Sequence, residues 1–233
     1  MLVALDETFD AASTNPDVRV IVLAAVGPVF CAGHDLKEMT AGRQNADRGR
    51  AYFTKILDQC SSVMQKIVAC PKPVIAEIDG VATAAGCQLV ASCDLAVASE
   101  TAQFCTPGVH IGLFCSTPMV ALSRNLANKH AMEMLLTGDM VSASRAAEMG
   151  LVNQVVPSAK LRAASMALAG KIAAKSSLTV ATGKQAFYQQ KEMDLAAAYN
   201  YASKIMADNM LARDAKEGIA AFIEKRVPDW RDE

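Results

Sequence analysis

Histidine is scarce in this sequence, and its cysteines are not paired at short spacing. The 233 residues include only three histidines, His34, His110 and His130, and no Cys-x-x-Cys pair. Zinc sites are built from clusters of these residue types, so we expect no metal centre. The cysteines number seven, an odd count, and we expect reduced, mostly buried thiols in an intracellular protein.

Neither sign of charge dominates, and no apolar run is long. The chain carries 23 Lys and Arg residues against 24 Asp and Glu, a net charge of −1. This balance argues against a nucleic-acid-binding protein, although it allows a local basic patch for a phosphorylated ligand. No stretch approaches the roughly 20 apolar residues of a membrane span, and no signal or transit segment opens the chain. We therefore expect no membrane span and a cytoplasmic location, or the mitochondrial matrix if a transit peptide has been removed.

Material for a folded core is abundant, since 52% of the residues are hydrophobic and 20% are charged. Hydrophobic periodicity in the front half predicts helices at 48–70 and 85–92 and strands at 17–26, 73–80, 95–100 and 102–104. In the back half, Ser142 is expected to cap a helix that ends at Gly150. A strand to Pro157 follows, and then helices near 158–175, 178–190, 193–212 and 215–226. This order indicates an α/β front and a helical back.

Two stretches look like halves of one site, "VFCAGHDLKEM" (29–39) and "GVATAAGCQLV" (80–90). In each, a strand ends in small residues and a helix begins, so a ligand can approach unpaired backbone N–H groups at the head of the helix. Two such amides converging on one oxygen form an oxyanion hole. For either stretch alone, the alternative is that its small residues only let a helix pack on a strand.

Together and in this order, these stretches resemble the crotonase (enoyl-CoA hydratase/isomerase) family. The resemblance spans nearly the whole chain and rests on "FCAGHDLKEM", "KPVIAEIDGVATAAGCQLVASCDLAVAS", "AQFCTPGVHIGL", "LLTGDMVSASRAAEMGLVNQVVP" and "EGIAAFIEKR". One subgroup of the family shares the histidine of "GHDL" and the run "ATAAGCQLVASCD". The resemblance implies an α/β fold, the crotonase (ClpP-like) spiral of ββα units, over 1–157 and a helical trimerisation region over 158–233. It also implies a first strand ahead of the helix that opens this chain; that strand is missing here, so either the sequence is truncated or this member lacks part of the usual ligand site.

The same resemblance implies acyl-CoA as the small-molecule partner, a homotrimer or hexamer, and no cofactor beyond the coenzyme A thioester itself. By motif position, the thioester carbonyl would lie between the backbone amides of His34 and Ala85. The other implied substrate contacts are Ala32, Asp35, Leu36, Ala84, Pro107, Ile111 and Ser116. Lys37 and Lys225 would meet the CoA phosphates as point charges, although both are equally typical of solvated surface lysines.

The chain departs from the family pattern where the acids should be. Hydratases of this family use two glutamates to hold and activate a water, and the corresponding residues here are Gln88 and Gly108. A glutamine can hold a water but cannot take its proton, and a glycine can do neither. Cys115 and Ser116 replace a proline and a glycine that are frequent in the family, which indicates a rebuilt active-site loop.

Other groups are weaker candidates for chemistry. The side chains of His34 and His110 are the nearest alternatives for acid–base work, but packing or solvent exposure is the simpler interpretation of both. Asp94 is expected to bond backbone amides, Glu77 to point outward from its strand, and Cys87 to be buried rather than nucleophilic.

Three functions are open at this point. The first is an atypical crotonase-type enzyme that stabilises an enolate. The second is a non-catalytic acyl-CoA binder or scaffold that has lost the acids. The third is thioester hydrolysis or acyl transfer, with Ser116 or a cysteine as the nucleophile. We favour binding of a CoA thioester, and catalysis over a scaffold role.

Overall fold

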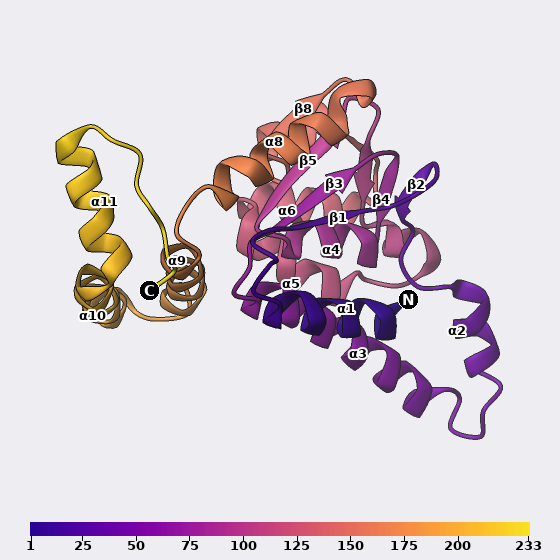
Figure 1. Cartoon of the computed structure of the whole chain (residues 1–233). Coiled ribbons are helices and arrows are strands. Elements are labelled where there is room, and N and C mark those ends of the chain that lie inside the picture. Colours follow the sequence, from indigo (N-terminus) through magenta and orange to yellow (C-terminus); the bar gives the residue numbers. More distant parts are fainter.

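Two four-stranded sheets form the centre of the chain in a computed structural model that describes residues 1–233 (Figure 1). The first sheet is parallel throughout, in the order β1 (Ile21–Ala24), β3 (Val74–Ile78), β5 (Leu95–Ser99) and β8 (Gln154–Val156). The second sheet has the order β2 (Val29–Cys31), β4 (Val81–Thr83), β6 (Gln103–Cys105) and β7 (Val141–Ser142). Only its β6–β7 pair is antiparallel.

The chain passes between the two sheets in a repeating order. The consecutive strands β1 and β2, β3 and β4, and β5 and β6 each place one strand in either sheet, and helices follow each pair. The helices of this part are α1 (Leu2–Thr14), α2 (Leu36–Gly42), α3 (Arg50–Ala69), α4 (Ala85–Ser92), α5 (Ser116–Asn125), α6 (Asn128–Thr137) and α7 (Ala143–Met149), with the 3₁₀ turns η1 (Pro107–Ile111) and η2 (Ser158–Lys160). This alternation is the expected ββα spiral, so the predicted fold class is confirmed.

Four helices make up the last part of the chain: α8 (Leu161–Ala173), α9 (Ser177–Gln190), α10 (Leu195–Leu211) and α11 (Arg213–Glu224). The first of them, α8, packs on the parallel sheet, whereas α9, α10 and α11 form a lobe beside the body (Figure 1). None of the helices is both long enough and apolar enough to cross a bilayer.

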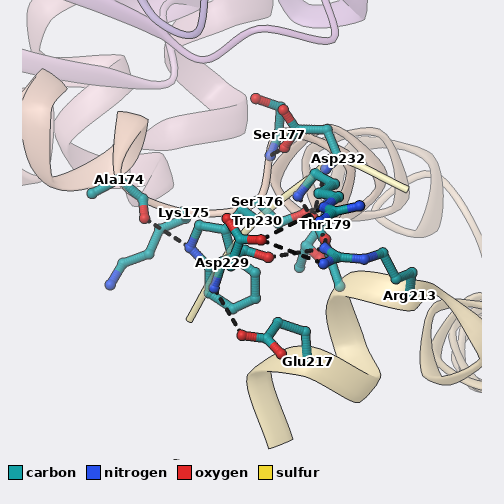
Figure 2. Close-up of polar contacts among 12 residues, drawn as sticks. Ala174, Lys175, Ser176, Ser177, Thr179, Arg213, Glu217, Asp229, Trp230 and Asp232 are labelled. Carbon is teal, nitrogen blue, oxygen red and sulfur yellow. Dashed lines mark hydrogen bonds and ion pairs between the residues drawn. The ribbon is translucent and has the colours of Figure 1, made fainter. Parts of the chain in front are cut away.

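The residues after α11 return to the junction between α8 and α9 (Figure 2). There the Asp232 carboxylate accepts hydrogen bonds from the Arg19 guanidinium and the Ser177 backbone N–H. The indole N–H of Trp230 donates to the Ala174 carbonyl at 3.0 Å. These contacts tie the lobe to the body through the tail of the chain.

Strand β3 separates two apolar clusters. Val74, Ala76 and Ile78 face the main core with α3 and α4, whereas Ile75 faces the cluster under α8. Successive side chains of a strand point to opposite faces, and a central parallel strand is buried on both of them. The run of β3, apolar except for Glu77, therefore reflects its position in the sheet.

Most predicted elements are confirmed, and two expectations about the parallel sheet are wrong. The helix at 85–92 is confirmed, as are the Ser142 cap and the end of α7 at Gly150. The buried strand predicted at 17–26 is limited to Ile21–Ala24 and is only half-buried, because β1 is an edge strand that pairs with β3 alone. The Glu77 side chain does not point into solvent but is 11% exposed, since α8 covers this face and Arg162 lies 3.4 Å from its carboxylate.

Candidate functional site

The turns after β2 and β4 bring the two predicted halves of the site together. These strands are parallel neighbours in the second sheet, so their carboxyl ends share one edge. Gly33 follows β2, and a Cβ built on it would lie 3.2 Å from the Ala85 nitrogen and 3.2 Å from the Ala84 Cβ. His34 is the next residue, so its amide lies one peptide unit from this contact.

Both predicted oxyanion donors lack an internal acceptor. The amide N–H of His34 donates to no backbone carbonyl. Ala85 is the first residue of α4, a position whose N–H has no intrahelical partner. The Asp35 carboxylate caps α2 by accepting from the Lys37 N–H at 2.7 Å and does not engage the His34 amide. An oxyanion hole needs two free donors within reach of one oxygen; here both N–H groups are free and belong to adjoining turns.

The turn into α4 contains a strained backbone conformation. Ala84 has φ 50° and ψ −117°, a region that residues other than glycine rarely adopt and that costs of order 1–3 kcal/mol. Gly86 then lets α4 approach β2, because a Cβ there would lie 2.0 Å from the Cys31 carbonyl oxygen. Strain of this kind concentrates at functional sites, whereas the close approach at Gly86 is what simple packing of a helix on a strand also requires.

The His34 side chain is half-buried next to its free amide. Its Nε2 atom is fully buried and has no hydrogen-bond partner. Burial lowers the pKa of the imidazole, which makes the ring neutral near pH 7 because an unperturbed histidine titrates at about 6.5. The ring therefore carries no positive charge to the site under physiological conditions.

Gln88 lies one turn beyond Ala85 in α4 and is only 4% exposed. Its Oε1 is fully buried and has no hydrogen-bond partner. The other predicted acid position, Gly108, is closed by its own loop. A Cβ there would lie 2.8 Å from the Leu113 carbonyl oxygen and 2.9 Å from the Cys115 sulfur. The exposed His110 in the same turn packs instead near Gly138.

The candidate nucleophiles lack the surroundings that would activate them. The Ser116 hydroxyl donates to the Phe114 carbonyl at 3.3 Å and bonds to no histidine or carboxylate. Burial raises the pKa of the thiols of Cys87, Cys105 and Cys115. A nucleophilic cysteine needs a lowered pKa, so these thiols are protonated near neutral pH.

The remaining residues predicted to contact the substrate lie in two separate parts of the structure. Exposed or half-buried residues surround the start of α2 and form η1: Ala32, Asp35, Leu36, Lys37, Pro107 and Ile111. Lys225 instead ends α11, in the lobe on the far side of the molecule from α2 (Figure 1). Within one chain, the two predicted phosphate-binding lysines are therefore not neighbours.

A buried cluster that the sequence did not reveal anchors the far end of α4. The Asp94 carboxylate, just after this helix, accepts from the Val74 N–H at 2.7 Å, as expected of a residue that bonds backbone amides. It also pairs with Lys184 of α9 at 2.6 Å and accepts from the Tyr188 hydroxyl at 2.9 Å. Lys184 donates further to the carbonyls of Ile67 and Lys72. Nothing in the local sequence distinguishes Lys184 from a surface lysine.

Known proteins resemble the chain over its full length. The sequence model of the family described as Enoyl-CoA hydratase/isomerase matches residues 1–233. Enoyl-CoA hydratase domain-containing protein 3, mitochondrial, from Rattus norvegicus is 50% identical over 93% of this chain and 70% of the relative. A solved enoyl-CoA hydratase from Mycobacterium smegmatis has a TM-score of 0.93 and 51% identity, covering 99% of this chain and 88% of that one. The solved human enoyl-CoA hydratase domain-containing protein 3 has a TM-score of 0.90 and 47% identity, over 98% and 90%.

Proposed function

Because this chain belongs to the enoyl-CoA hydratase/isomerase family, we propose that it binds acyl-CoA thioesters and holds the thioester carbonyl between the amides of His34 and Ala85. The observation that carries the proposal is the close approach of the two turns, since a Cβ built on Gly33 would lie 3.2 Å from the Ala85 nitrogen. Two N–H donors aimed at one oxygen stabilise the negative charge of an enolate or a tetrahedral oxyanion.

The reaction differs from hydration by two carboxylates. Such hydration needs one group to take a proton from water and another to deliver one. Gln88 is neutral, and the loop around Gly108 leaves no room for a side chain. We therefore propose a site that polarises the thioester and depends on no carboxylate. The same observation favours a second candidate, a non-catalytic acyl-CoA binder. Hydrolysis through Ser116 or a cysteine has less support, because neither is activated.

The proposal is tested by comparing butanoyl-CoA with S-butyl-CoA, a thioether that lacks the carbonyl oxygen. Each hydrogen bond to that oxygen is worth roughly 0.5–1.5 kcal/mol, or about two- to tenfold in affinity. Calorimetric titration should therefore show tighter binding of the thioester. Equal affinity for the two compounds would contradict the oxyanion hole.

A second assay separates the enzyme from the binder. Crotonyl-CoA hydration is followed by loss of the conjugated-thioester absorbance, on protein whose binding of butanoyl-CoA confirms correct folding. We expect binding without hydration at enzymatic rates. Fast hydration would mean that an unidentified group activates the water, and His110 and Ser116 would then be the next residues to mutate.

Assembly and location follow from the same family membership. We propose a homotrimer or a hexamer, in which Lys225 of one copy would reach the CoA of another, since it lies far from Lys37 in its own chain (Figure 1). Many exposed apolar residues of the lobe, among them Leu211, Phe222 and Ile223, support self-association. The word mitochondrial in the name of the rat relative supports a mitochondrial location over the cytoplasm.

A further inference from the structure

The side-chain amide of Gln88 lacks the partners that buried polar groups normally have. In folded proteins, most buried polar side chains are hydrogen-bonded, and each exception needs an explanation. Two further buried atoms, His34 Nε2 and the Ser165 hydroxyl, also lack a partner, whereas other buried polar groups of this chain follow the rule. The Thr106 hydroxyl donates to the Met134 carbonyl at 2.9 Å, and the Ser92 hydroxyl donates to the Gln88 carbonyl at 2.8 Å. Gln88 is 4% exposed, and its Oε1 atom is fully buried without a hydrogen-bond partner.

The position of Gln88 in α4 directs this amide toward the oxyanion donors. Residues three apart in a helix are neighbours on its surface, and Gln88 is three residues after Ala85. Helical side chains lean toward the helix N-terminus. The Gln88 side chain therefore leans toward the turn that carries the free Ala85 N–H, where the acyl carbons next to a bound thioester carbonyl would lie.

We propose that Gln88 is a specificity-determining residue that selects acyl-CoA thioesters with a hydroxyl group on a carbon close to the thioester. This inference rests on the proposed function, because it presumes that the thioester carbonyl is bound at Ala85. A primary amide both donates and accepts, and so does a hydroxyl, so the two match in either orientation of the amide. A saturated acyl chain would leave the buried amide unpaired, and sites with such polar groups discriminate against ligands that cannot bond to them.

The test measures the affinities of butanoyl-CoA, 2-hydroxybutanoyl-CoA and 3-hydroxybutanoyl-CoA for three proteins. These are the wild type, Gln88→Met, which keeps the size of the side chain and removes the amide, and Gln154→Met, a matched control at an exposed glutamine in β8. We expect the wild type and the control to bind one hydroxy isomer about tenfold more tightly than butanoyl-CoA. In Gln88→Met, that preference should vanish.

Thermal melting adds a readout that a purely structural glutamine would not give. Removing an unpaired buried polar group should raise the melting temperature of Gln88→Met, whereas loss of a structural hydrogen bond would lower it. Equal wild-type affinity for all three thioesters, a preference that survives in Gln88→Met, or a lower melting temperature of that variant would overturn the inference and leave the proposed function standing. If the wild type binds none of the three, the proposed function itself fails, and the inference fails with it.

Discussion

A methyl group added at Gly33 should disable the proposed oxyanion hole without unfolding the chain. In Gly33→Ala, the new Cβ would lie 3.2 Å from the Ala85 nitrogen, in the space that an acceptor oxygen would need. Gly33 has φ 87°, and alanine in a left-handed conformation costs about 1–2 kcal/mol. That is roughly 2–8 °C in melting temperature for a chain of this size. The variant should therefore fold while losing at least one donor.

Gly150→Ala is the matched control for this strain. Gly150 has φ 91°, close to that of Gly33, but a Cβ there would meet only the Asn125 carbonyl oxygen at 3.9 Å. Both variants should therefore carry similar backbone strain, to which Gly33→Ala adds the crowding of its Cβ against the Ala84 Cβ at 3.2 Å. Any difference in ligand binding between them reports on the space next to Ala85 and not on the left-handed backbone.

The assay is the ratio of the dissociation constants of S-butyl-CoA and butanoyl-CoA, because it cancels the contribution of the CoA moiety. We expect this ratio to fall by roughly two- to tenfold in Gly33→Ala and to stay at the wild-type value in Gly150→Ala. An unchanged ratio in Gly33→Ala, with the expected loss of melting temperature, would refute the assignment of the Ala85 amide. A fall of the same size in both variants would show that strain alone explains the effect.

Three further predictions concern the closed loop, the buried ion pair and the tail. Gly108→Glu should lower the free energy of unfolding by about 1–3 kcal/mol through overpacking and gain no crotonyl-CoA hydration, since a Cβ there would lie 2.8 Å from a loop carbonyl oxygen. A stable variant that hydrates crotonyl-CoA would contradict the closed loop. Lys184→Met should lower the free energy of unfolding in urea by about 3–5 kcal/mol, because it leaves the Asp94 carboxylate buried without its cation. Adding Asp94→Asn should restore part of this loss. If the losses of the two single variants simply add, Lys184 and Asp94 are not coupled. Burial alone would raise the pKa of Asp214, but hydrogen bonds from the tail, including the one from the Arg231 N–H, lower it overall. The ionised Asp214 carboxylate therefore stabilises the fold above its unfolded pKa of about 3.9, and this stabilisation is lost as the pH falls. Below about pH 4, the free energy of unfolding of Asp214→Asn should accordingly fall less steeply with decreasing pH than that of the wild type. Identical slopes would exclude a contribution of Asp214 to acid unfolding.

Local sequence predicted the elements around the site well. The helix at 85–92 follows a strand through small residues and lies in one buried run, so its bounds depend on local chemistry. Ser142 and Gly150 delimit α7 for the same reason, since a hydroxyl caps one end and a left-handed glycine ends the other. These signals act within a few residues, which is why reading along the chain finds them.

Contacts between distant segments explain what the sequence could not predict. The apolar run at 17–26 has the composition of a buried strand, but only the pairing with β3 decides where β1 starts and ends. Glu77 is covered because α8, more than eighty residues later, packs on its face of the sheet. Lys184 reaches Asp94 across 90 residues. The closure of the loop around Gly108 likewise depends on where Leu113 and Cys115 come to lie.

In the proposed site, two backbone amides would stabilise negative charge on a thioester oxygen, but neither of the two predicted acid positions, Gln88 and Gly108, carries a carboxylate. Gln88 cannot ionise, and the pKa of the imidazole of His34 is lowered by burial while that of the Cys115 thiol is raised. A reaction here must therefore exchange protons with the substrate or with water, without a carboxylate. Because Gly108 lacks space as well as charge, restoring a glutamate at Gln88 alone would rebuild only half of a hydratase. In our proposals, the backbone supplies recognition of a carbonyl, and the unpaired Oε1 of Gln88 adds a requirement on the acyl group.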